Sequence, residues 1–199
     1  MGSWVNLMSN GNGNGVDDAY LALPASRSGL GVLVLHAWWG RTQFILNLCD
    51  RLASEGFVAL APDLFGGQTA QTIERAEQLA SNASDDDASR ITNAAVDTLR
   101  NHPAVTGPGV AVLGFSFGAA WALLLSGSRP DDVAKTIIFY GTYSDVDISN
   151  ARASYLGHFA ADDPYEPAEA VEAMEAAVRA AARPVTFHTY PGTGHWFFE

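Results

Sequence analysis

Apolar and polar positions follow two different periods along most of the chain. A continuous apolar run at residues 31–36 is typical of a strand covered on both faces of a sheet, and residues 57–61 and 109–114 have a similar pattern. Further strands are predicted at 135–140 and 184–190, with a weaker one at 154–159. Stretches with apolar residues at helical spacing lie between them, at residues 42–54, 72–80, 88–100, 117–125 and 168–181. This alternation predicts an α/β fold with a mostly parallel central sheet of about eight strands and helices on both faces.

The N-terminal residues 1–24 have a different pattern. Two short apolar stretches, 4–8 and 19–23, flank the run of Gly and Asn at 11–15. Glycine and asparagine accept positive φ readily, so this run suits the loop of a hairpin. Because neither an internal repeat nor a linker divides the chain, we expect one domain over residues 1–199.

The composition narrows the function classes. With 199 residues, 48% of them apolar, the chain can build a sizeable core. Acidic residues outnumber basic residues by 22 to 11, and the net charge of −11 argues against nucleic acid or an anionic membrane as a partner. The single cysteine, Cys49, leaves no disulfide within the chain, and no segment has the pattern of a signal peptide or a membrane span. We therefore expect a cytoplasmic protein, either a monomer or a homodimer.

Ser116 is the candidate nucleophile. It is the centre of Gly-x-Ser-x-Gly at residues 114–118, directly between a predicted buried strand and a predicted helix. A strand that turns at once into a helix holds its central residue in a tight bend, and the flanking glycines leave room for that bend. The backbone N–H of Phe117 lies at the start of the helix, where N–H groups are unpaired and the dipole favours negative charge. A tight structural turn without chemistry is the alternative.

A serine hydroxyl needs a histidine within hydrogen-bond reach and an acid that orients this base. Of the five histidines, His195 follows the last predicted strand on a glycine-rich loop, which can carry its imidazole over Ser116. The acid should follow an earlier strand. The sequence has no cluster of ligand residues with metal-binding spacing, so we expect no metal and no organic cofactor. Spacing alone does not separate Asp162 from Asp163, and Asp145 and Asp147 are the second choice.

The segment HAWWG at 36–40 follows an earlier strand, where a second oxyanion donor is expected. We predict the backbone N–H of Trp38 as this donor, beside that of Phe117. The side chains of His36, Trp39 and Trp196 are predicted to line a substrate pocket. Packing of the tryptophans against the helix at 42–54 is the structural alternative, and both roles are compatible.

Several of these segments resemble the dienelactone hydrolase family. The resemblance extends from about Tyr20 to Phe198, and it implies an α/β-hydrolase fold with esterase or lactonase chemistry. In the family the acid stands four residues before a proline, which selects Asp163 over Asp162. The segments are HAWWG at 36–40, APDLF at 61–65, GFSFG at 114–118, HFAADDPYEP at 158–167 and YPGTGHWF at 190–197.

Three positions depart from the best-known members of that family. Those members carry a cysteine where this chain has Ser116, a glutamate where it has Ala37, and an arginine that binds a substrate carboxylate where it has Glu199. The first two changes are consistent, because a serine–histidine pair does not need the carboxylate that manages a thiol. The third argues against dienelactone as the substrate. The family continues into a final helix past the position of Glu199, so we expect that helix to be missing.

The sequence therefore predicts a hydrolase that cleaves small-molecule carboxylic esters or lactones with Ser116, His195 and Asp163. A thioesterase or a peptidase could use the same three residues. A binding protein that kept the fold without the chemistry is the alternative from another class, and the intact set of three residues argues against it.

Overall fold

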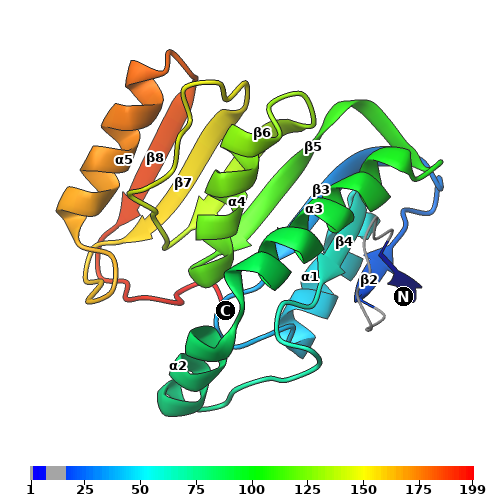
Figure 1. Cartoon of the computed structure of the whole chain (residues 1–199), viewed down its shortest axis with the longest axis horizontal. Helices are drawn as coiled ribbons and strands as arrows, with labels where there is room; N and C mark the ends of the chain where they lie inside the picture. Colours follow the sequence, from blue (N-terminus) through cyan, green and yellow to red (C-terminus); the bar gives the residue numbers. More distant parts are fainter. Residues whose placement is uncertain (1, 8–16) are drawn as a thin grey trace.

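The computed structural model describes residues 2–7 and 17–199. Within them, eight strands form one sheet in the order β1-β2-β4-β3-β5-β6-β7-β8 (Figure 1). The loop predicted at residues 11–15 lies outside the described residues. The strands are β1 (Ser3–Asn6), β2 (Asp18–Ala22), β3 (Gly29–Leu35), β4 (Val58–Pro62), β5 (Val105–Phe115), β6 (Val133–Phe139), β7 (Ser154–Ala160) and β8 (Val185–Tyr190).

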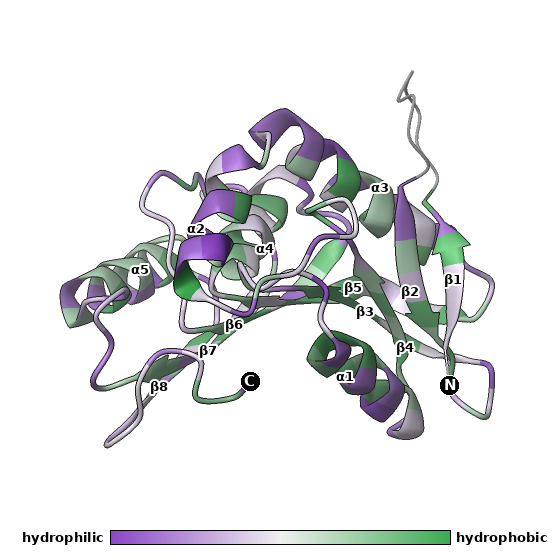
Figure 2. Ribbon diagram, turned by 90° about the horizontal axis from the view of Figure 1, so that it is seen from below, coloured by the Kyte–Doolittle hydropathy of each residue, from purple (hydrophilic) through white to green (hydrophobic). Residues whose placement is uncertain are grey.

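Helices cover both faces of this sheet. In Figure 2, α1 lies on one face and α2, α3, α4 and α5 lie on the opposite face. This arrangement confirms the predicted α/β fold with helices on both sides. No helix in the described part of the chain is long and apolar enough to cross a membrane. The helices are α1 (Gln43–Ser54), α2 (Ile73–Asn82), α3 (Asp85–Asn101), α4 (Phe117–Ser128) and α5 (Ala168–Ala180).

The direction of the strands places the site. The pairs from β4 through β3, β5, β6 and β7 to β8 are all parallel, whereas β2 pairs antiparallel with both β1 and β4. The strand order reverses at β3, because β4 lies on one side of it and β5 on the other. In open sheets of this kind, ligands bind beyond the carboxyl ends of the strands at such a reversal.

The apolar runs of the sequence explain the two cores. In β3, Leu33 packs into the cluster under α3 and α4, and the next residue, Val34, packs into the cluster under α1. Neighbouring residues of a strand point to opposite faces, so a strand covered on both sides must be apolar throughout. From α1, Ile45 and Cys49 are buried in the second cluster.

The ends of the helices follow local chemistry. The helix predicted to start at residue 88 begins at Asp85, because the Ser84 hydroxyl accepts the backbone N–H of Asp87 at 3.3 Å. Asp85, Asp86 and Asp87 then occupy the first turn, where the helix dipole favours negative charge. A glycine follows the C-terminal end of α1. The helix stops before Gly56, whose φ of 94° is easily adopted only by glycine.

The sheet is covered less completely on the face that carries α1. Beside this helix lies an apolar hollow of about 380 Å³, with Leu113, Ile137 and Phe139 of the sheet and Phe198 near the chain end among its lining residues. In Figure 2 the C-terminal segment runs below the sheet on this face, next to α1.

Candidate active site

The bend at Ser116 has the geometry of a nucleophile elbow. Ser116 is the single residue between β5 and α4, and its φ of 46° and ψ of −111° are unfavourable for a residue with a side chain. A Cβ at Gly114 would lie 2.3 Å from the carbonyl oxygen of Gly118, and one at Gly118 would lie 2.3 Å from that of Leu35. Only glycine fits at both positions, so the sequence motif produces the strained turn.

Three side chains from distant loops meet at this turn. The Oγ atom of Ser116 lies 3.0 Å from Nε2 of His195, and Nδ1 of His195 lies 2.7 Å from Oδ2 of Asp163. The loops after β5, β8 and β7 supply them, all at the carboxyl edge of the sheet. The side chains of His195 and Asp163 are 3% and 2% exposed, so water is largely excluded from their hydrogen bond.

The structure distinguishes the two adjacent aspartates. Asp163 uses Oδ2 for the imidazole, while its Oδ1 accepts the backbone N–H groups of Tyr165 at 2.9 Å and Glu166 at 3.1 Å. Asp162 has an exposed side chain, and its backbone N–H donates to the carbonyl of Thr193 at 3.1 Å. Asp163 is therefore the aspartate that contacts the imidazole of His195, and the backbone of Asp162 links the acid loop to the histidine loop.

Burial and the neighbouring acid act on His195 in opposite directions. Burial lowers the pKa of His195 below its usual value of 6.5, and the hydrogen bond and charge of Asp163 partly oppose this effect. The imidazole is therefore neutral near pH 7. With its Nδ1–H donated to Asp163, Nε2 is free to accept a proton from the Ser116 hydroxyl, as a general base must.

The other candidates of the sequence lie away from this contact. His102 accepts the backbone N–H of Ala104, and His158 and His188 stack on each other on β7 and β8. Asp147 accepts the backbone N–H of Ser149 in the loop after β6. No group of three or more His, Cys, Asp or Glu in residues 2–7 and 17–199 could hold a metal ion.

The two predicted oxyanion donors come from adjacent segments. Phe117 is the first residue of α4, whose first N–H groups have no acceptor within the helix. The N–H of Trp38, in the loop after β3, donates to no other residue in the described ranges. A Cβ at Gly118 would lie 2.7 Å from the carbonyl oxygen of His36, so α4 begins directly against the start of that loop.

Aromatic side chains surround His195. Trp38 stacks on Trp196 with ring centroids 5.5 Å apart, and Trp39 meets Trp196 edge-on at 5.0 Å. The ring of Tyr165 lies 5.5 Å from Trp38 and 5.0 Å from His195. The indole N–H groups of Trp38 and Trp196 are buried without a partner among the described residues. Sequence reasoning did not select Tyr165, although its place two residues after Asp163 was a signal.

His36 and Glu199 have surroundings that the sequence did not predict. His36 is fully buried, and both ring nitrogens contact backbone groups, so its predicted place in the lining of a substrate pocket is corrected. Glu199 was singled out only as a departure from the family. Its carboxylate accepts the hydroxyl of Tyr140 at 2.9 Å, and the Tyr140 ring lies 5.0 Å from His195. Burial raises the pKa of Glu199 to about 7.

The sheet order and the serine at a strand-to-helix elbow define an α/β-hydrolase. A model of the dienelactone hydrolase family matches residues 18–199, and the chain belongs to this family. It is therefore a hydrolase that acts on ester or lactone bonds of small molecules.

Two curated relatives come from the genus Aquifex. "Protein usf" of Aquifex pyrophilus is 31% identical over 188 residues, which are 90% of this chain and 81% of that protein. "Putative carboxymethylenebutenolidase" of Aquifex aeolicus is 34% identical over 128 residues, which are 61% of this chain and 55% of that protein.

Solved structures share the fold over nearly the whole chain. A dienelactone hydrolase-like promiscuous phosphotriesterase from metagenomic libraries has a TM-score of 0.84 at 24% identity and covers 100% of this chain and 85% of its own. Native esterase 2 of Thermogutta terrifontis has a TM-score of 0.76 at 15% identity and covers 99% of this chain and 84% of its own. At these identities the similarity shows the fold alone.

Proposed function

We propose that the protein is a serine carboxylesterase or lactonase with Ser116 as nucleophile, His195 as general base and Asp163 as the residue that orients it. The observation that carries this proposal is the continuous chain of contacts, 3.0 Å from Ser116 to His195 and 2.7 Å from His195 to Asp163. The strained elbow, which is unfavourable for serine, is a second support, because such strain persists where the surroundings impose it and is concentrated at active sites.

The proposed reaction is acyl transfer in two halves. His195 removes the proton of Ser116 while Oγ attacks the ester carbonyl, and the backbone N–H groups of Trp38 and Phe117 hold the oxyanion that forms. Asp163 stabilises the imidazolium, which then protonates the leaving alcohol. Water, activated by the same histidine, attacks the acyl-enzyme and releases the acid. No step needs a metal or an organic cofactor.

We further propose that the acyl group of the substrate carries no carboxylate. Glu199 reaches the catalytic histidine through Tyr140, and with a pKa of about 7 its carboxylate is mostly ionised at pH 8. Arg41, close to the loop of Trp38, is already paired with Asp18 at 2.7 Å and Asp63 at 3.5 Å. An anionic substrate would therefore meet a like charge without a matching cation.

Initial rates on matched substrates test both the proposed ester hydrolysis and the proposed preference for an uncharged acyl group. We expect turnover of p-nitrophenyl butyrate and of the methyl ester of mono-p-nitrophenyl glutarate, and slower turnover of the free glutarate acid at pH 8. Glu199→Gln should reduce the difference in rate between the glutarate methyl ester and the free glutarate acid. Hydrolysis of acyl-thioesters or peptide amides in preference to every ester and lactone would contradict the proposed bond specificity. A cytoplasmic location and the oligomeric state, monomer or homodimer, stay predictions.

A further inference from the structure

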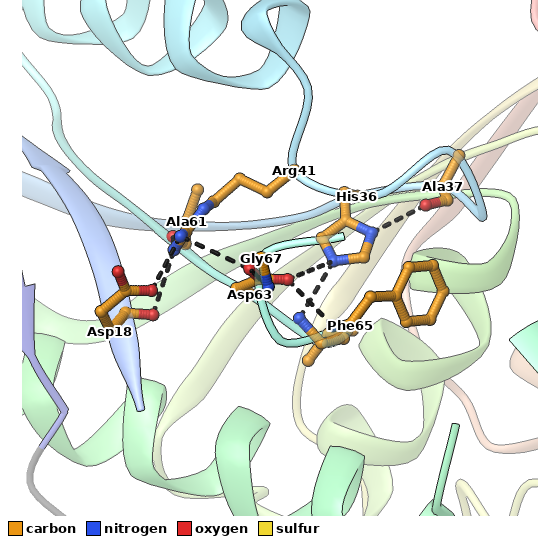
Figure 3. Close-up of polar contacts among 9 residues, drawn as sticks. Asp18, His36, Ala37, Arg41, Ala61, Asp63, Phe65 and Gly67 are labelled. Carbon is orange, nitrogen blue, oxygen red and sulfur yellow. Dashed lines mark hydrogen bonds and ion pairs between the residues drawn. The ribbon is translucent and has the colours of Figure 1, made fainter. Parts of the chain in front are cut away.

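A second histidine stands directly before the loop that carries Trp38. We call residues 37–40 the oxyanion loop. His36 precedes it at the end of β3 and is completely buried, so no solvent reaches its ring. Its Nδ1 lies 2.7 Å from the carbonyl oxygen of Ala37, and its Nε2 lies 3.1 Å from the backbone nitrogen of Leu64. Figure 3 shows the ring between these two segments of backbone.

These partners leave one protonation state for His36. A carbonyl oxygen can only accept a hydrogen bond, so Nδ1 must carry a proton and donate it to Ala37. A backbone N–H can only donate, so Nε2 must be unprotonated and accept from Leu64. The ring is therefore the neutral Nδ1–H tautomer, held by groups that have fixed roles.

The carbonyl of Ala37 and the N–H of Trp38 belong to the same peptide plane. In a trans peptide these two groups point in opposite directions, so fixing one direction fixes the other. The Ala37 oxygen accepts from His36 at 2.7 Å and from the backbone N–H of Gly40 at 3.1 Å. Two donors to the carbonyl oxygen thus fix the opposite direction of the Trp38 N–H, which has no protein acceptor among the described residues.

The segment below the oxyanion loop is itself held rigidly. The carboxylate of Asp63 accepts the N–H of Phe65 at 2.9 Å and the N–H of Gly67 at 2.5 Å, which fixes the backbone on both sides of Leu64. The same carboxylate lies 3.5 Å from the guanidinium of Arg41, the residue directly after the oxyanion loop (Figure 3). The N–H of Ala70 donates to the carbonyl of Trp39 at 2.9 Å.

We propose that His36 is a positioning residue for the oxyanion hole. Its Nδ1–H holds the Ala37–Trp38 peptide so that the Trp38 N–H is aligned before substrate binds. This inference rests on the proposed function, because it assigns the Trp38 N–H to the oxyanion. Without the His36 donor, the Ala37–Trp38 peptide plane could rotate. The Trp38 N–H would then have to be aligned during the reaction itself. Preorganised donors avoid that cost, which is the source of their catalytic effect.

Two substitutions at residue 36 separate this role from packing. In His36→Asn, the side-chain amide can present an N–H at the position of Nδ1. In His36→Gln, the amide lies one bond further out, so it can accept from Leu64 but loses the donor to Ala37. We expect kcat of His36→Asn to stay within about tenfold of wild type, and kcat of His36→Gln to fall by about 10²–10³ with KM little changed, as for the loss of one oxyanion donor.

A trifluoromethyl ketone, which forms a tetrahedral adduct with an oxyanion, gives a readout that packing alone would not move. Its inhibition constant should rise across the variants by the same factor by which kcat/KM falls. Equal kcat for the folded Asn and Gln variants would overturn the inference, whether both values are high or both are low. An active wild type in the same assay keeps the proposed ester hydrolysis intact if this test fails.

A measurement on the wild-type protein decides the matter if the variants do not fold. Nitrogen-15 NMR should show His36 as the neutral Nδ1–H tautomer, and the amide proton of Trp38 should shift downfield when the ketone adduct forms. An unshifted Trp38 amide, or a proton on Nε2 of His36, would overturn the inference.

Discussion

Two regions of the molecule present a histidine at the carboxyl end of the sheet, and their partners differ. His195 bridges two side chains, the Ser116 hydroxyl at 3.0 Å and the Asp163 carboxylate at 2.7 Å. His36 bridges two backbone groups, the carbonyl of Ala37 and the N–H of Leu64. A side-chain hydroxyl can give up its proton during a reaction, whereas backbone groups keep fixed roles. The difference between the two histidines therefore lies in their partners, which is why we propose a proton carrier at His195 and a positioning residue at His36.

The electrostatic surroundings reinforce this difference. Burial lowers the pKa of both imidazoles. At His195, the hydrogen bond and charge of Asp163 work against burial, so the ring can still accept a proton in the reaction. At His36, the hydrogen bond to Ala37 and the charge of Asp63 work against burial, while Arg41 adds to it. The His36 ring is closed to solvent and stays neutral.

The largest effect is expected at His195. In His195→Gln, no group remains to take the proton of Ser116, so kcat should fall by about 10⁶, as for the loss of the histidine in comparable triads. His102→Gln is the matched control, because the His102 ring accepts the backbone N–H of Ala104 in its own loop, away from Ser116, and it should keep full activity. Steady-state ester hydrolysis measures both, and substantial activity in His195→Gln would exclude this histidine as the base.

The next effect is expected at Asp163. Asp163→Asn removes the acceptor that selects the tautomer of His195, and kcat should fall by about 10⁴. The adjacent substitution Asp162→Asn changes an exposed side chain and should leave kcat unchanged. A larger loss for Asp162→Asn than for Asp163→Asn would reverse the assignment of the two acids.

The pH dependence of the reaction gives a third comparison. Activity needs neutral His195, and its pKa lies below 6.5, so kcat/KM should stay level at neutral pH and fall only below pH 6.5. Asp163 raises the pKa of His195, so its removal in Asp163→Asn should move this acidic limb to still lower pH. A limb centred above pH 7 in the wild type would contradict the burial of this imidazole.

The smallest effect concerns stability and belongs to His36. Its folded-state pKa is lower than the value of 6.5 in the unfolded chain, so below pH 6.5 the unfolded state binds more protons and the free energy of unfolding falls. For one proton the slope is at most about 1.4 kcal/mol per pH unit. Urea unfolding of wild type and His36→Asn between pH 7.5 and pH 5.5 isolates this contribution, which the variant lacks. Parallel pH profiles would argue against a buried neutral His36.

The sequence predicted those features that depend on local patterns. The apolar runs predicted the parallel strands, because strands buried on both faces must be apolar throughout. The Gly-x-Ser-x-Gly motif between a buried strand and a helix predicted the elbow, although only Gly114 is required by a local contact, with Gly118, whereas Gly118 is required by the distant backbone of Leu35. The starting point of α3 was set three residues late, since Ser84 caps the helix ahead of the apolar face.

Features that depend on long-range contacts could not be predicted in this way. The role of His36 follows from its contact with Leu64, which is 28 residues away. The contact between Tyr140 and Glu199 joins residues 59 positions apart. Tyr165 is placed against Trp38 and His195 by the meeting of three loops. No pattern within a single strand or helix records these contacts, because packing of separate elements creates them.

Covalent labelling shows whether Ser116 is a nucleophile that His195 activates. The protein is incubated with a fluorophosphonate probe and the adduct is located by peptide mass spectrometry. We expect one adduct at Ser116, much slower labelling in His195→Gln, and none in folded Ser116→Ala. A folded wild-type protein without an adduct, or an adduct on another serine, would contradict this expectation.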